Sequence, residues 1–188
     1  MHRRISKGMG LAAVAAVCLM SPAAALAADA TSTGTVTGGT LSLSTTAAPT
    51  FSATLDGANK TPTYTVPFTL NDARGTGVGW NTTITSTQFK DATTSKTLPA
   101  DASSITGVIS AVAGGTATDP VNGVDYTNGV GIPAGATAPT DPIKFFNAGV
   151  DSGMGKFTVT PTVAVSVPAN SYAGTYSSTV TLADVSGP

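Results

Sequence analysis

The sequence predicts an all-β protein with an antiparallel, immunoglobulin-like β-sandwich fold. Three observations support this fold class. Thr, Val, Ser, Gly and Pro are abundant, while charged residues make up only 10% of the 188 residues. Several short segments alternate apolar and polar residues with a period of two, as half-buried strands do. Turn-forming residues separate these segments, and no apolar pattern of helical period accompanies them.

Three alternating segments precede the centre of the chain. The first, 40–45, places Leu41 and Leu43 on one face, and the second, 51–55, repeats the pattern. The third, 63–70, contains Pro67, which lacks a ladder N–H and favours an edge or a bulge. We therefore expect three strands in this part of the chain.

The central stretch, 71–89, reads as a strand, a glycine-rich connection and a second strand. Gly75, Gly77 and Gly79 are interpreted as backbone positions with positive φ or a bulge. A phosphate loop is not expected, since a strand and not a helix follows these glycines. The second strand begins at Trp80, the only tryptophan, which shares a face with Ile84.

The second half contains the longest regular pattern. In 157–167, apolar residues alternate with Thr and Ser, and Pro161 falls on the apolar face, where it indicates a kink or an edge. The least regular region is 111–142, for which we expect short strands around 123–126. The other segments, in order, are a polar connection at 90–104, strands at 105–109 and 143–146, a turn-rich stretch at 147–155, and a strand at 175–182.

Residues 1–27 are expected to be a secretory signal peptide. A basic start precedes an apolar run that is too short to span a bilayer. Cleavage is expected after Ala27 or after Ala30, and residues 28–188 are expected to form one domain. No membrane association is expected after cleavage.

Removal of residues 1–27 leaves few reactive groups. Cys18 and His2 are lost, and the sequence contains no glutamate. Catalysis by Ser-His-Asp or Cys-His groups is therefore excluded, and no motif supports a Ser-Lys pair. We expect a non-catalytic protein without a cofactor. Zinc lacks its favoured ligands, and the aspartates match no calcium-loop spacing, so no metal is expected.

The charge balance excludes one class of partner. From residue 28 onward there are ten Asp against five Lys and one Arg, which leaves a net charge of −4. A mildly acidic chain without a basic patch is not expected to bind nucleic acid or an anionic membrane.

The central run DARGTGVGWN is followed by a Thr-rich strand and Phe89. This arrangement resembles the first signature of the WxL-domain surface proteins of Gram-positive bacteria. The C-terminal run VPANSYAGTYSSTVTLADVSGP resembles the end of the domain, and NAGVDSGMGKFTVTP lies between them. The resemblance covers about 39–188. It implies a secreted protein that is associated non-covalently with the cell wall through peptidoglycan, or with other surface proteins.

This chain departs from the family pattern at two points. Trp80 matches the tryptophan of the first motif, but Thr82 stands where the family name requires leucine. The second W-x-L motif is missing, because 179–182 contains no tryptophan. The chain is therefore identified as a divergent, WxL-like member.

The candidate contacts for the wall are Trp80, Asp72, Arg74, Thr82 and Tyr172. Trp80 either fills the sandwich core or offers an exposed indole to a ligand. Asp72 and Arg74 lie two residues apart, and we expect a local ion pair that shapes the glycine-rich loop. The alternative function is a structural subunit or adhesin-type protein whose free strand edges pair with neighbours. A secreted protein without surface attachment also stays open, and so does the oligomeric state.

Overall fold

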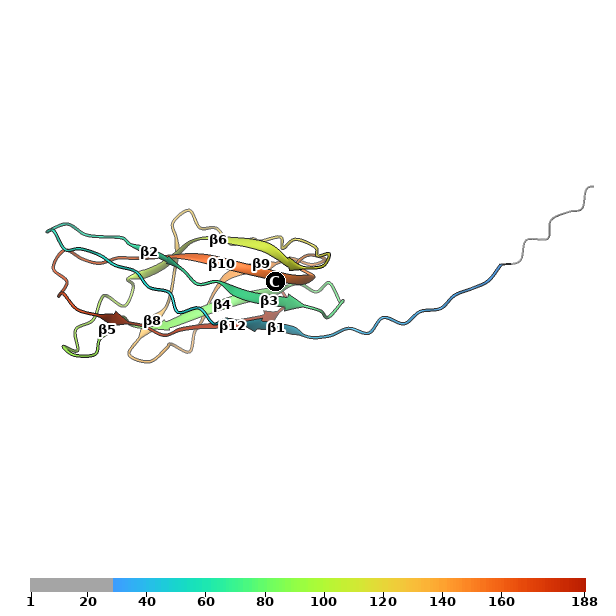
Figure 1. Ribbon diagram of the computed structural model, residues 1–188, viewed down its shortest axis with the longest axis horizontal. Coiled ribbons are helices and arrows are strands. Elements are labelled where there is room, and N and C mark those ends of the chain that lie inside the picture. The colour runs from blue at the N-terminus through green and yellow to red at the C-terminus, as the bar shows by residue number, and fades with distance from the viewer. Residues whose placement is uncertain (1–28) are drawn as a thin grey trace, which may run out of the picture. The chain divides into compact units, whose positions relative to one another are not determined.

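A computed structural model describes residues 29–188, where all regular secondary structure is β-strand (Figure 1). The all-β prediction is confirmed, and within this range only β4 and β8 pair in parallel. The predicted signal peptide, with Cys18 and His2, lies outside the described residues, and its cleavage stays a prediction. None of the described segments is a helix long and apolar enough to cross a membrane. The strands all lie in the unit Val36–Pro188, which is described below.

The first sheet is built around β10, the strand predicted at 157–167. Its odd-numbered residues from Phe157 to Val165 are buried, which confirms the predicted apolar face. The sheet has the order β1-β3-β10-β6-β7, and β2 pairs with β10 beyond the end of β3. The strands are β1 (Leu41–Ser44), β2 (Thr63–Thr65), β3 (Phe68–Asp72), β6 (Ser103–Gly114), β7 (Val130–Gly131) and β10 (Gly155–Val165).

Pro161 interrupts one ladder of this sheet. In the register that joins β10 to β2 and β3, Pro161 lies opposite Val66. The N–H of Val66 donates to the carbonyl of Pro161 at 3.1 Å, but Pro161 has no N–H to return the bond. The segment predicted as one strand at 63–70 is therefore divided into β2 and β3. β10 itself is paired on both sides, so the proline marks a gap in the ladder and not an edge strand.

The second sheet is built around β4. β12 pairs with one edge of β4, β9 pairs with the other edge, and β8 joins its end. A separate two-stranded pair, β5 with β11, continues beyond the sheet. The strands are β4 (Trp80–Thr87), β5 (Lys90–Asp91), β8 (Ala134–Gly135), β9 (Ile143–Ala148), β11 (Tyr176–Ser177) and β12 (Val180–Ser186).

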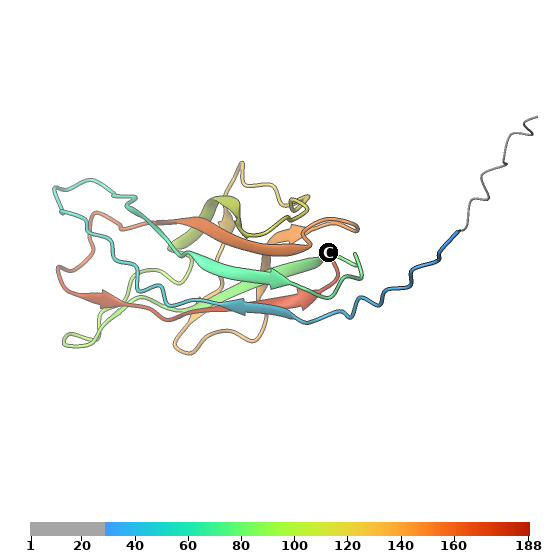
Figure 2. The same ribbon diagram turned by 45° about the vertical axis from the view of Figure 1, so that its right-hand side comes forward.

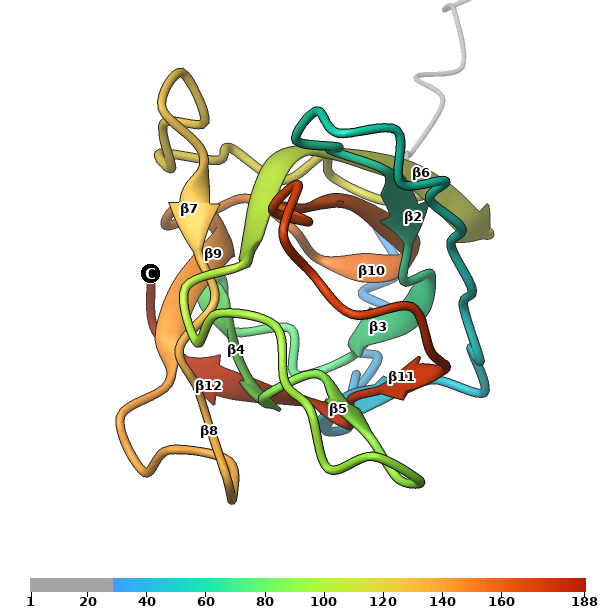
Figure 3. The same cartoon turned by 90° about the vertical axis from the view of Figure 1, so that its left-hand side faces the viewer.

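The two sheets face each other across one apolar core. In a view along the strands, β6, β10 and β3 lie on one side and β4 and β12 on the other (Figure 3). Phe68 of β3 packs edge-on against Phe145 of β9, with 6.1 Å between the ring centroids. The arrangement agrees with a β-sandwich, and the immunoglobulin-like type stays a prediction. The largest side chains without solvent exposure are Trp80, Phe145, Phe157, Leu70 and Ile84.

The strand predicted at 51–55 is absent. Phe51 is partly buried and stacks on Tyr64 at 5.9 Å, but the segment has no ladder partner. Only Phe51 is partly buried and 52–55 are exposed, so the alternation in this segment does not correspond to a buried face.

The strands predicted around 123–126 are also absent, and this segment is a loop that covers the outer edge of β9. The N–H of Gly123 donates to Oδ1 of Asn147 at 3.0 Å, and the N–H of Asn147 donates to Oδ1 of Asn122 at 3.2 Å. The hydroxyl of Tyr126 donates to the carbonyl of Phe145. These hydrogen bonds thus occupy backbone groups at the edge of β9 that would otherwise lack partners.

Candidate functional site

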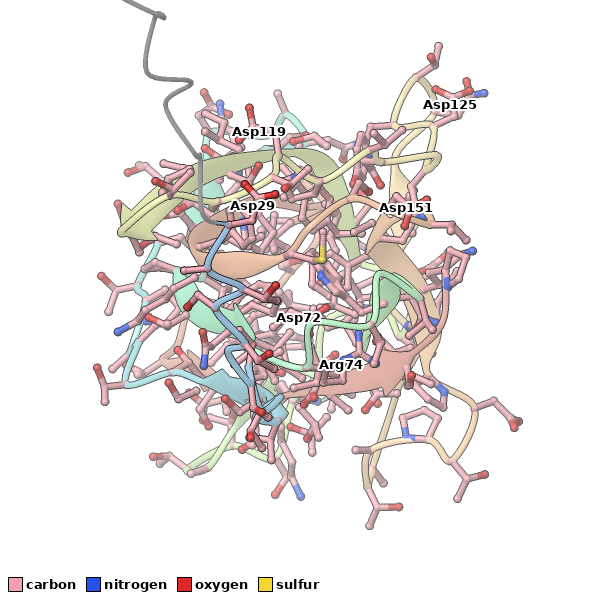
Figure 4. All side chains as sticks on the ribbon, turned by 90° about the vertical axis from the view of Figure 1, so that its right-hand side faces the viewer. Asp29, Asp72, Arg74, Asp119, Asp125 and Asp151 are labelled. Atoms are coloured by element: carbon pink, nitrogen blue, oxygen red, sulfur yellow. The ribbon has the colours of Figure 1, made fainter. Side chains whose placement is uncertain are left out.

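Asp72 and Arg74 form the predicted ion pair where β3 leads into the glycine-rich loop (Figure 4). Nε and one terminal nitrogen of Arg74 each donate to a different oxygen of Asp72 at 2.8 Å. The guanidinium also donates to the carbonyl of Gly79 at 2.7 Å and to Oγ of Ser186 at 2.6 Å. Arg74 therefore ties the loop to β12 and has few donors left for a ligand.

The carboxylate of Asp72 is held in its charged form. The bidentate hydrogen bonds from Arg74 lower the pKa of Asp72, and they outweigh the opposing effect of burial. The side chain is 1% exposed. Asp72 thus anchors the loop from within, and its role as a wall contact stays a prediction.

Trp80 lies in the core. The indole has no solvent exposure, and its Nε1 donates to the carbonyl of Gly153 at 2.9 Å. A side chain on Gly153, which has φ of 69°, would come within 2.6 Å of that nitrogen. Of the two roles considered for Trp80, the structure agrees with the core role. An exposed ligand contact requires a face that this indole does not present.

The glycines before Trp80 have the predicted backbone geometry, since Gly75, Gly77 and Gly79 all have positive φ. At Gly79 any side chain would collide with the carbonyl of Ala148, the β9 residue paired with Trp80. Because these glycines have no side chains, the loop backbone packs closely against β9 and excludes solvent from the indole.

Thr82, the residue at the third motif position, is also buried. Its hydroxyl donates to the carbonyl of Phe146 at 3.2 Å, across the irregularity in the β4–β9 ladder. Every buried side-chain nitrogen and oxygen in the described part of the chain has a hydrogen-bond partner. Thr82 therefore presents no exposed group in this structure, and its role in wall contact stays a prediction.

Tyr172 is the one sequence-predicted candidate that is exposed. The residue is 61% exposed, and its ring lies under Nζ of Lys96, which is 4.3 Å from the ring centroid. The hydroxyl of Tyr176 donates to the backbone carbonyl of Tyr172 at 2.9 Å. Tyr172 therefore presents an ordered aromatic face to solvent.

Tyr172 stands on the rim of a large groove, which we call the wedge groove. Its two walls are the segments 45–55 and 172–182. Its volume is about 1120 Å³. β1 and β12 run side by side in opposite directions without pairing, and beyond them the two walls separate (Figure 2). The deepest lining residues are apolar or aromatic: Phe51, Tyr64, Val66, Phe89, Leu98 and Val167.

The chemistry of the wedge groove is suited to binding. Burial raises the pKa of Tyr64 to about 12, so its phenol stays neutral at ordinary pH. The lining contains Thr, Ser and Tyr hydroxyls but no carboxylate, imidazole, thiol or ammonium group. Within residues 29–188, no backbone hydrogen bond joins 48–55 to another segment. The groove therefore combines an apolar floor with free peptide groups along one wall.

Asp91 fixes the other wall, and the sequence analysis did not select it. Oδ1 accepts from the N–H groups of Thr93 and Thr94 and from the Thr94 hydroxyl, while Oδ2 accepts from the N–H of Thr175 at 2.8 Å. Gly174 packs so closely on this carboxylate that a side chain would come within 2.5 Å of Oδ2. The run Asp91-Ala92-Thr93-Thr94 is the sequence signal, because Asp readily caps such turns.

We predict that Asp91→Asn lowers the melting temperature at pH 7 and that the loss disappears in acid. Hydrogen bonds, chiefly from the backbone of Thr94, lower the pKa of Asp91 in the folded protein. A lowered pKa contributes stability above the unfolded value of about 3.9, and this contribution is lost as the pH falls through the folded value. Thermal unfolding followed by circular dichroism between pH 7 and 2.5 measures the difference.

Asp141→Asn is the matched control for this test, because Asp141 is an exposed aspartate outside the wedge groove. It is expected to leave the melting temperature unchanged at every pH. A difference between Asp91→Asn and wild type that persists undiminished at pH 2.5 would contradict the assignment.

Aspartates of the described connecting loops lie in separate places and form no cation site. Figure 4 shows Asp119, Asp125 and Asp151 apart from one another. Oδ1 of Asp125 accepts from the N–H and hydroxyl of Thr127. In residues 29–188 no three Asp, Glu, His or Cys side chains come together as a group that would hold a metal ion.

The family comparison agrees with the sequence resemblance. A family profile described as "WxL domain surface cell wall-binding" matches residues 25–185. Comparison with curated proteins and with solved structures gives no match. Because the profile spans nearly the whole chain, the protein belongs to the family of WxL-domain, cell wall-binding surface proteins.

Proposed function

We propose that this protein is a secreted, non-catalytic surface protein that binds peptidoglycan non-covalently through the wedge groove. The observation that carries the proposal is the combination of aromatic floor, hydroxyl-rich rim and unpaired backbone along 48–55. Peptidoglycan has sugar rings with apolar faces and peptide stems with amide groups. The aromatic side chains suit the first, and the free peptide groups suit the second.

The family membership supports the wall as the partner, and the lining of the groove supports binding without turnover. The lining offers hydroxyls and peptide groups but no carboxylate, imidazole, thiol or ammonium group that could act as a general acid or base near neutral pH. Tyr172 is the contact residue that we select from the sequence-based candidates. Trp80, Asp72, Arg74 and Thr82 support the fold around the loop.

We predict that Tyr172→Ala reduces retention on washed peptidoglycan about tenfold. One aromatic contact contributes about 1.5 kcal/mol, which corresponds to that change in affinity. The measurement is co-sedimentation with purified sacculi, followed by release in denaturing detergent to show that attachment is non-covalent. Muramidase-digested fragments are expected to compete with the sacculi.

Val150→Ala provides the control, because Val150 is 67% exposed and lies outside the groove. It is expected to sediment like the wild type. The proposal is abandoned if Tyr172→Ala and Phe51→Ala both keep full retention while circular dichroism shows that they are folded.

The alternative function, a structural subunit that pairs through strand edges, has one observation in its favour. β6 leaves an edge of the first sheet open over most of its length. If the purified protein pellets without sacculi, at the speed that pellets sacculi, large assemblies and not wall binding explain the retention.

A further inference from the structure

β6 has one free edge. Along one side it pairs with β10 from Ser103 to Gly114. Along the other side it pairs with β7 only at Ser104 and Ile105. From Thr106 onward no strand within residues 29–188 adjoins this edge (Figure 1).

The register identifies the backbone groups that point outward. β10 directs the peptide groups of its odd-numbered residues towards β2 and β3, as the bond from Val66 to the carbonyl of Pro161 shows. The even-numbered residues of β10 therefore bond to β6, where they lie opposite Gly107, Ile109 and Ala111. The groups that point to the free edge belong to Val108, Ser110 and Val112.

The side chains along this edge do not protect it. The run 106–118 contains no charged residue and no proline. Ile109 is 71% exposed and Val112 is also exposed. Proteins usually block such edges with charges, prolines or a covering loop. Here a loop bonds to the edge of β9, while beyond the strand ladders no backbone hydrogen bond joins 106–114 to any described segment.

A second copy of this chain is the partner that these features fit. The chain from residue 28 onward carries a net charge of −4, so two copies repel each other except where their surfaces are uncharged. Antiparallel pairing about a twofold axis places the same strand on both sides, and 106–114 brings no like charges together. It also brings the exposed Ile109 side chains of the two copies into contact.

We propose that residues 106–114 of β6 pair antiparallel with the same residues of a second copy, about a twofold axis at Ile109. In this register Ile109 lies opposite Ile109 of the second copy, and Val108 exchanges hydrogen bonds with Ser110 of the second copy. The pairing joins the two first sheets into one continuous sheet. Edge pairing buries a modest area, so the dimer dissociates on dilution.

The first test measures the molecular mass of the chain 29–188 in solution by sedimentation velocity, over a range of concentrations. These residues contain every described strand and core residue. The wild type is expected to change from monomer to dimer as concentration rises. Ile109→Lys is expected to stay monomeric, because it adds a charge to each side of the twofold. Ser110→Pro is expected to do the same, because it removes an outward N–H.

Val185→Lys is the matched control. Val185 is 46% exposed on β12, so the new lysine lies on the other sheet. This variant is expected to dimerise like the wild type, and thermal melts verify that all three variants are folded. A wild type that is monomeric at every concentration overturns the proposal. So does a dimer that both β6 variants leave intact.

A cysteine cross-link tests the register. Residues 29–188 contain no cysteine, so Ile109→Cys introduces a single thiol. Opposed residues of a non-hydrogen-bonded pair have Cα atoms about 4.5 Å apart, within the range of a disulfide. Mild oxidation is expected to link Ile109→Cys into a covalent dimer, while Thr181→Cys, exposed on β12, stays unlinked. Equal linking of both variants, or of neither, overturns the twofold at Ile109.

Discussion

Trp80→Ala is expected to lower the free energy of unfolding by about 3–5 kcal/mol. The indole has no exposed surface, packs against Phe146 at 5.6 Å and donates to Gly153, so truncation leaves a large cavity and an unpaired carbonyl. Urea unfolding followed by far-ultraviolet circular dichroism measures the loss, because the variant has no tryptophan fluorescence.

Trp80→Phe is the matched variant. It keeps an aromatic ring but loses the hydrogen bond. Its free energy of unfolding is expected to lie between those of the wild type and Trp80→Ala. In the wild type, acrylamide is expected to quench the fluorescence only after unfolding. Efficient quenching of the folded protein would falsify the buried position of Trp80.

Arg74→Met is expected to lower the free energy of unfolding by about 3 kcal/mol at neutral pH. It leaves the carboxylate of Asp72 almost fully buried without its bidentate partner, and it removes the bonds to Gly79 and Ser186. Asp72 then binds a proton more readily, so the difference from wild type is expected to shrink as the pH is lowered. Urea unfolding at pH 7 and pH 4 measures both effects.

The double variant Asp72→Asn with Arg74→Met is expected to recover part of the loss, because no uncompensated charge stays buried. Lys60→Met is the control, since it breaks the other ion pair, Lys60 with Asp56, at an exposed position. It is expected to leave stability unchanged. If Arg74→Met behaved like Lys60→Met, the pair would have no structural role.

The fold was predictable where one face of a strand is buried. β3 and β10 have the alternation that such burial produces, and each was expected within a few residues of its position. β4 was also expected where it lies, although both of its faces are largely buried. β6 was expected to end at Ile109, because its exposed second half has no buried face to create a pattern. The segment 51–55 shows the opposite case, in which Phe51 packs on the core but the backbone finds no partner.

The candidate site was less predictable, because its parts are distant in sequence. Asp72 and Arg74 lie two residues apart, so the sequence alone was sufficient to predict their ion pair. The wedge groove arises where 45–55 and 172–182 separate, and no sequence pattern records such a gap. The burial of Trp80 depends on Gly153, which lies on a different loop.

Pro67 and Pro161 have a consequence for how the chain selects its alignment during folding. Sliding β10 past β3 by one position would turn its apolar side chains to solvent, but sliding by two would keep every face as it is. Hydrophobicity alone does not distinguish those alignments. The two prolines do, because in the observed register Pro161 lies opposite Val66 and Thr160 lies opposite Pro67, so both prolines fall at one interruption of the sheet. A shift by two would separate them and create a second interruption, so the prolines favour the observed alignment.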